Sequence, residues 1–129
     1  MNKIVQIKIF NDILDQFFDY LETNFKFFKS DIVLTRTATE FIRKSNPRLV
    51  VEQFMMAVMP YQKHIFNCDE DFFLNFEENI PKNSLSSDNI LSGMRIKTMW
   101  LSDEITDTQK AYIWLYFQKM IKAGEKVLI

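Results

Sequence analysis

Apolar residues recur every three or four positions along nearly the whole chain, and this spacing is typical of amphipathic helices. The chain contains only two glycines and three prolines, so it has few residues suited to the tight turns of β-hairpins. The sequence therefore predicts an all-α fold. Its length of 129 residues fits one domain, 1–129, and we expect a compact bundle of five or six helices.

The first predicted helix carries an apolar stripe on one side and an acidic row on the other. The stripe consists of Phe10, Ile13, Leu14, Phe17, Phe18, Leu21, Phe25 and Phe28. The row consists of Asp12, Asp15, Asp19 and Glu22, which we interpret as a solvated face rather than as paired catalytic carboxylates. Residues 4–9 alternate in polarity as a strand does, but no second strand is available to pair with them. We therefore favour helix there.

Two further helices are predicted around a turn at Asn46 and Pro47. The first carries Ile32, Leu34, Ala38, Phe41 and Ile42 on its apolar side, with Ser30 or Asp31 as its cap. Asn46 is predicted to cap the next helix, with Pro47 at its first position. That helix turns Val50, Phe54, Ala57, Val58, Tyr61 and Ile65 toward the core. Because Pro60 has no backbone N–H, we expect this third helix to be kinked or broken there.

The C-terminal half is predicted as helices joined by one clear loop. A short helix over 67–80 would be capped by Asn67 or Asp69, and a loop follows at 81–89. A fifth helix begins at Ser87 or Asp88 and runs to about 101. The last helix runs from about 106 to 123, with Gly124 placed to close it. The apolar end at 127–129 either docks on the bundle or frays.

Charge and composition exclude several classes of protein. The chain has 16 basic and 17 acidic residues, so no overall positive charge favours binding to nucleic acid or to a membrane surface. No window approaches the ~20 apolar residues of a membrane span. The N-terminus lacks the features of a secretion signal, so we expect an intracellular protein. One Cys and one His exclude a disulfide framework and multi-histidine metal sites.

The single His and the single Cys lie four residues apart, at His64 and Cys68. On a helix this spacing places them on one side, which makes them candidates for a metal site or a thiol active site. Zinc needs three or four convergent ligands, and the acidic residues 69–71 point in different directions. The same acidic residues disfavour a reactive thiolate. We predict no catalytic residue, no metal site and no cofactor.

A basic cluster surrounds the turn between the second and third helices. It consists of Arg36, Arg43, Lys44 and Arg48. Residues 29–64 contain six basic and three acidic residues, so this stretch is a candidate phosphate contact next to a helix N-terminus. The alternative is a solvated helix–turn surface, because the cluster lacks interleaved exposed aromatic residues.

Two groups of apolar residues lie outside the predicted core faces. Met55, Met56 and Met59 fall on the far side of the third helix, and methionines make adaptable contact surfaces. Tyr112, Leu115 and Tyr116 lie on the flank of the last helix, and tyrosine is enriched at interfaces. These six residues are the candidate interface. The alternative is that another helix of the chain covers each group.

Two stretches carry a family resemblance, NPRLVVEQFMMAVMPYQKHIFNCDEDFF (46–73) and MWLSDEITDTQKAYIWLYFQKMIKAGE (99–125). With the Phe-rich first helix, they resemble small all-helical proteins encoded by large nucleocytoplasmic DNA viruses. The abundance of Ile, Phe, Lys and Asn is consistent with the AT-rich genomes of such viruses. The resemblance implies a helical fold and a viral source, and it assigns no catalytic residue to this chain.

These observations together predict a non-enzymatic viral protein that acts through protein–protein contact or in virion assembly. Its partner would be another viral protein or a second copy in a homo-oligomer, in the host cytoplasm and in the virion. The alternative function is nucleic-acid binding through the basic helix–turn surface.

Overall fold

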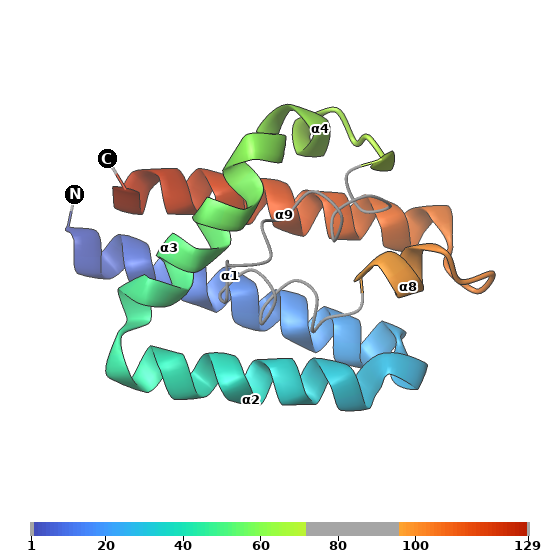
Figure 1. Cartoon of the computed structure of the whole chain (residues 1–129), viewed down its shortest axis with the longest axis horizontal. Helices are drawn as coiled ribbons and strands as arrows, with labels where there is room; N and C mark the ends of the chain where they lie inside the picture. Colours follow the sequence, from blue (N-terminus) through green and yellow to red (C-terminus); the bar gives the residue numbers. More distant parts are fainter. Residues whose placement is uncertain (1, 72–95, 129) are drawn as a thin grey trace.

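A computed structural model describes residues 2–71 and 96–128, apart from the side chains of residues 96 and 97, and within that part the fold is all-α (Figure 1). The longest helices are α1 (Lys3–Asn24), α2 (Lys29–Ser45), α3 (Pro47–Val58) and α9 (Asp107–Leu128). Shorter elements are the 3₁₀ turns η1 (Lys26–Phe28) and η2 (Met59–Tyr61) and the helices α4 (Gln62–Phe66) and α8 (Ile96–Trp100). Residues 4–9 belong to α1, so the helical interpretation of that segment is confirmed.

Helices α9, α1 and α2 lie side by side, and α3 crosses them at an angle (Figure 1). Helices α1 and α9 run in opposite directions, so the N-terminal end of α1 lies beside the C-terminal end of α9 (Figure 1). There the Lys3 ammonium donates hydrogen bonds to the carbonyl oxygens of Lys126, at 3.1 Å, and of Val127, at 2.9 Å. A cation at the C-terminal end of a helix also interacts favourably with the helix dipole.

Aromatic rings join α1, α3 and α9 at the centre of the core. Phe54 contacts Phe10 at a ring-centroid distance of 5.3 Å and Phe117 at 5.9 Å. Phe117 also contacts Phe17 at 5.5 Å. Such edge and offset contacts are favourable beyond the area that the rings bury. The predicted α1 stripe is largely buried, whereas Ile13 and Phe28 are half-buried.

The turn between α2 and α3 forms as its sequence predicts. Asn46 precedes α3, and its side-chain oxygen accepts a hydrogen bond from the Leu49 N–H at 3.2 Å. Pro47 occupies the first position, where a missing N–H costs nothing. At the other end, α3 stops at Val58 and Pro60 lies inside the η2 turn, so the helix is interrupted at the expected place.

The predicted cap of α2 was wrong. The helix begins at Lys29, ahead of Ser30 and Asp31, and no side chain caps its first turn. Instead, η1 runs directly into α2, and the Lys29 N–H bonds the carbonyl oxygen of Lys26. The 3₁₀ turn therefore occupies the place that the sequence assigned to a side-chain cap.

Helix α9 begins as predicted but ends later than predicted. Thr106 and Gln109 form a reciprocal capping box, because each side chain accepts a hydrogen bond from the other residue's N–H. Gly124 was expected to close the helix, but α9 continues through it to Leu128. Gly124 instead makes room for packing, because a Cβ built there would overlap the sulfur of Met55. Val127 is buried, so this part of the end docks.

Several predicted elements lie outside the described residues. These are most of the helix over 67–80, the loop at 81–89, and the start of the fifth helix at Ser87 or Asp88. The described remainder of the fifth helix is α8. Asn67 follows α4 as its C-cap rather than starting a helix, whereas Asp69 accepts a hydrogen bond from the Asp71 N–H at 3.0 Å, as a capping side chain does.

The contact between Gly124 and Met55 yields a stability prediction. In Gly124→Ala the new methyl group meets the fully buried Met55 side chain, and overpacking of this kind costs about 1–3 kcal/mol. Met55→Ala alone leaves a cavity. In the double variant the methyl group fills part of that cavity, so we expect a loss in unfolding free energy smaller than the sum of the single losses. Urea unfolding of the four proteins measures this, and additive losses would contradict it.

Candidate functional site

Helix α2 is rotated relative to its predicted orientation. Leu34 and Phe41 were expected in the core, but their exposed fractions are 69% and 76%. Ala38, between them, is also exposed. Of the predicted inward residues, Ile32 is buried and Ile42 is half-buried. We call Leu34, Ala38 and Phe41 the outer stripe.

Two threonines take the inward positions instead. Thr35 and Thr39 are buried, and each hydroxyl donates a hydrogen bond to the carbonyl oxygen four residues earlier, at 2.9 Å and 2.8 Å. These bonds satisfy the hydroxyl groups within α2, so the threonines can be buried without unpaired polar atoms. Sequence reasoning missed them because apolar spacing alone does not include threonine.

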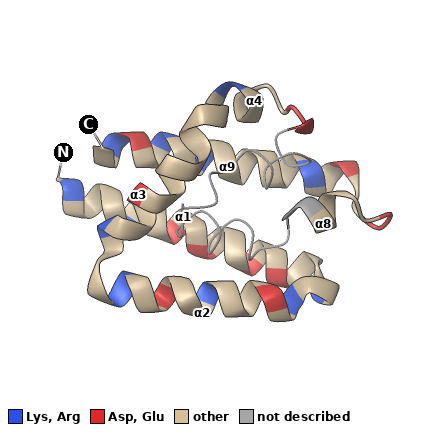
Figure 2. Cartoon of the chain, viewed as in Figure 1, with Lys and Arg blue, Asp and Glu red and all other residues tan. Residues whose placement is uncertain are grey.

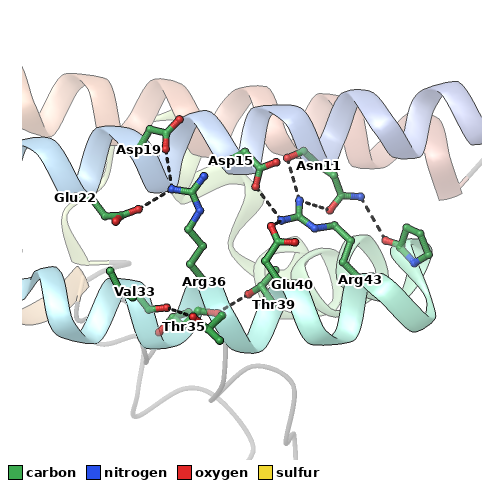
Figure 3. Close-up of polar contacts among 12 residues, drawn as sticks. Asn11, Asp15, Asp19, Glu22, Val33, Thr35, Arg36, Thr39, Glu40 and Arg43 are labelled. Atoms are coloured by element: carbon green, nitrogen blue, oxygen red, sulfur yellow. Dashed lines mark hydrogen bonds and ion pairs between the residues drawn. The ribbon is translucent and has the colours of Figure 1, made fainter.

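Arg36 links the middle of α2 to α1 (Figure 3). One guanidinium nitrogen lies 2.7 Å from a carboxylate oxygen of Asp19 and 2.6 Å from one of Glu22. The guanidinium group also lies 5.6 Å from the centre of the Phe18 ring. Burial lowers the pKa of Arg36, but the hydrogen bonds and charges of the two carboxylates outweigh it, so the pKa is raised. The arginine therefore stays charged and held against α1.

Arg43 repeats this arrangement two turns further along (Figure 3). It pairs with Asp15 of α1 at 2.8 Å and with Glu40 of its own helix. It also donates to the backbone and side-chain oxygens of Asn11, at 3.4 Å and 3.3 Å. Only 13% of the Arg43 side chain is exposed. A largely buried guanidinium requires such partners, because an unpaired buried charge is costly.

The acidic row of α1 is therefore not simply a solvated face, and the earlier interpretation is corrected. Asp15, Asp19 and Glu22 contact the arginines of α2, whereas Asp12 pairs with Lys8 on the surface. Figure 2 shows acidic residues of α1 along the side that faces α2. Like charges close together on one helix are stabilised here by cations from the next helix.

The predicted phosphate contact is not assembled into one free patch. Arg36 and Arg43 bond to carboxylates of this chain, and Arg48 pairs with Glu52 at 2.8 Å. Lys44 is exposed and makes no ion pair with the described residues. Three of the four cations are thus compensated internally, which leaves little net positive charge for a phosphate backbone.

The methionine group of the candidate interface is split. Met55 was expected on the outer side of α3 but is 1% exposed, and that expectation was wrong. The reason is α9, which crosses next to α3 and receives Met55 at Gly124. Met56 and Met59 are exposed, so these two methionines remain available to a partner.

The flank of α9 is partly covered by α1. Tyr116 is half-buried, and its ring contacts those of Phe17 and Tyr20 at tilted angles, with centroid distances of 5.2 Å and 5.7 Å. Tyr112 contacts Tyr20 at 5.4 Å but remains exposed, as does Leu115. Burial raises the pKa of Tyr20, and the neighbouring Tyr112 and Tyr116 raise it further. Another helix of the chain, α1, therefore covers Tyr116, whereas Tyr112 and Leu115 are exposed and their role at an interface stays a prediction.

His64 and Cys68 lie at the C-terminal end of α4, where the chain reverses. Cys68 has a left-handed φ of 54°. Its N–H bonds the carbonyl oxygen of Ile65, and the Asp69 N–H bonds that of His64. This is a known helix-ending motif in which glycine usually takes the left-handed position. The reversal brings the Asp69 carboxylate to 2.8 Å from Nδ1 of His64.

The hydrogen bonds at this turn explain why the pKa of Asp69 is lowered. The hydrogen bond from His64 and that from the Asp71 N–H lower the pKa of the carboxyl group. The Cys68 sulfur accepts a hydrogen bond from the Gln118 side-chain amide at 3.7 Å. Among the residues that the structure describes, no group of three His, Cys, Asp or Glu side chains is placed to hold a metal ion.

Comparisons with known proteins add no family to this picture: no family model, curated protein or solved structure matches the chain. The resemblance to viral helical proteins stays a prediction. None of the described helices is both long enough and apolar enough to cross a membrane.

Removal of the positive charge should have unequal effects at Arg43 and at its neighbour Lys44 on α2. Arg43→Met leaves Asp15 and Glu40 without their shared cation, and hydrogen bonds to charged groups contribute about 1.5–3 kcal/mol each. We expect Arg43→Met to lower the unfolding free energy by about that much. Lys44→Met is the matched control and should change it by under about 0.5 kcal/mol. Equal effects in denaturant unfolding would contradict a structural role for Arg43.

The backbone of Cys68 predicts that glycine is preferred at this position. A left-handed conformation costs a residue with a Cβ about 1–2 kcal/mol, whereas glycine adopts it freely. Cys68→Gly should therefore unfold at higher denaturant concentration than Cys68→Ala, by about 1 kcal/mol in free energy. If the alanine variant were as stable as the glycine variant, the left-handed backbone at position 68 would not reduce the stability of the protein.

Proposed function

We propose that the chain is a protein-interaction module and that the outer stripe of α2 is its contact surface. The observation that carries this proposal is the orientation of α2, which buries two threonines and exposes Leu34 and Phe41. The Arg36 and Arg43 ion pairs hold that orientation. The proposal assigns no reaction to the chain.

The spacing of the outer stripe supports a specific contact rather than scattered exposure. Single exposed apolar side chains are common on protein surfaces and need no explanation. Here Leu34, Ala38 and Phe41 stand at positions i, i+4 and i+7 of one helix, which is the pattern of anchors in helix recognition. Phe27, in the η1 turn that precedes α2, is also 90% exposed.

Other surfaces remain secondary candidates. Met56, Met59, Tyr112 and Leu115 are exposed, and their role at an interface stays a prediction. Nucleic-acid binding is less well supported, because the arginines it needs pair with carboxylates of the same chain. A viral source, a role in virion assembly and self-association stay predictions from the sequence.

Site-specific photocrosslinking in the native host cells tests this proposal. A benzophenone amino acid replaces Leu34 in one protein, Leu115 in a second and the exposed polar Gln16 of α1 in a third. We expect a discrete higher-mass product from position 34 and none from position 16. Products from position 115 alone would place the interface on α9 and refute the assignment to α2. Circular dichroism of each purified protein controls for folding.

A further inference from the structure

We propose that the exposed side of α9 binds to the surface of an anionic lipid bilayer. This inference goes beyond the proposed function, because it concerns another helix and another kind of partner. Helix α1 lies between α2 and α9 (Figure 1), so the outer stripe of α2 and the exposed side of α9 are separate surfaces.

The exposed side of α9 has an apolar half and a basic half. Its residues follow at alternating spacings of four and three, which keeps them on one side of a helix. In order, the exposed residues of this side are Thr108, Tyr112, Leu115, Lys119, Lys122 and Lys126. We call the three lysines the lysine row. None of the six residues is acidic.

The positive charges of the lysine row are not compensated by the described part of the chain. None of the three lysines makes an ion pair with the described residues, and neither does the exposed Lys63 of the adjoining α4. Figure 2 shows lysine positions on α4 and on the C-terminal half of α9. The one acidic residue between them on α9, Glu125, is half-buried and accepts a hydrogen bond from Gln62 at 2.8 Å.

The carboxylates of the neighbouring elements are paired or lie elsewhere. Asp69 contacts His64, and Glu70 pairs with Lys110. The acidic row of α1 pairs with cations of α1 and α2. Unpaired acidic residues near α9 lie toward its N-terminal end, at Asp71, Asp103, Glu104 and Asp107. The nearly balanced charge of the whole chain therefore includes a local positive surface.

Large apolar side chains lie beside these lysines. The Lys122 ammonium is 5.9 Å from the centre of the Phe66 ring, and Phe66 is 38% exposed. Leu115, one turn before Lys119, is 42% exposed. At a bilayer interface, ammonium groups meet anionic headgroups while apolar side chains enter the boundary below them. The mixture of lysines and apolar residues on this side matches that chemistry.

A nucleic acid fits this side less well than a lipid surface does. Recognition of nucleic acids commonly adds arginine forks and stacked rings to lysine contacts with phosphate. Neither α4 nor α9 contains an arginine. Leu115 has no ring on which a base could stack. The lipid surface is therefore the partner that uses both halves of this side.

Sedimentation with lipid vesicles tests the proposal on the full chain. One set of vesicles is phosphatidylcholine alone, and the other contains about 30% phosphatidylserine. At low salt we expect at least about tenfold tighter binding to the phosphatidylserine vesicles. Raising the salt to about 0.3 M should remove most of this binding, because ions screen the charges. Failure to bind phosphatidylserine vesicles at low salt overturns the proposal.

Two triple variants with the same net charge locate the surface. The first combines Lys119→Gln, Lys122→Gln and Lys126→Gln. The matched control removes three exposed lysines of η1 and α2 with Lys26→Gln, Lys29→Gln and Lys44→Gln. Because each lysine near an anionic surface contributes about fivefold, the first variant should weaken binding at least about tenfold and the control less than about threefold. Equal losses would make net charge the cause and overturn the assignment to α9. Circular dichroism controls for folding.

Two further comparisons separate a lipid surface from other anionic partners. Leu115→Ser should weaken vesicle binding about threefold, because it removes an apolar contact with the bilayer. Val33→Ser, at a 39% exposed position of α2, is the control and should not. Fluorescence anisotropy then measures binding to duplex DNA, to single-stranded RNA and to a polyglutamate peptide. If any of these binds more tightly than the phosphatidylserine vesicles and depends on the lysine row, the lipid assignment is overturned.

Discussion

The ion pairs between α1 and α2 determine which side of α2 faces the core. Arg36 and Arg43 are seven residues apart, and α1 presents Asp15, Asp19 and Glu22 to them. Once both guanidinium groups reach these carboxylates, the rotation of α2 about its axis is fixed. The same rotation buries the threonines and turns Leu34 and Phe41 to solvent. The strongest candidate for function is therefore a consequence of electrostatics inside the fold.

Much of the fold follows from the sequence because local signals agree with tertiary packing. The Phe stripe of α1, the Asn46–Pro47 turn and the start of α9 are each specified by residues within one or two turns. Gly124 shows where local reasoning fails. Its usual role is to end a helix, but a crossing helix needs the space beside it. No spacing rule within α9 can reveal Met55 on α3.

The candidate site was predicted less well, for related reasons. Apolar periodicity assigned Leu34 and Phe41 to the core because it considers only apolar residues. It ignores threonines whose hydroxyl groups bond within their own helix, and arginines that pair with carboxylates on another helix. The exposed members of the predicted interface, such as Met56 and Tyr112, were found because they fall outside a well-defined apolar face. Met55 was misassigned because α3 packs on two sides, against α1 and α9.

The pairing of α1 with α9 also governs when this core can form during synthesis. The Lys3 side chain meets backbone groups more than 120 positions away, and the rings of α1 pack on Phe117. A nascent chain on the ribosome has no α9 to cover its Phe-rich first helix. That helix therefore emerges with its aromatic side uncovered, and final collapse waits until α9 has been synthesised. In this interval the growing polypeptide is a natural client for chaperones.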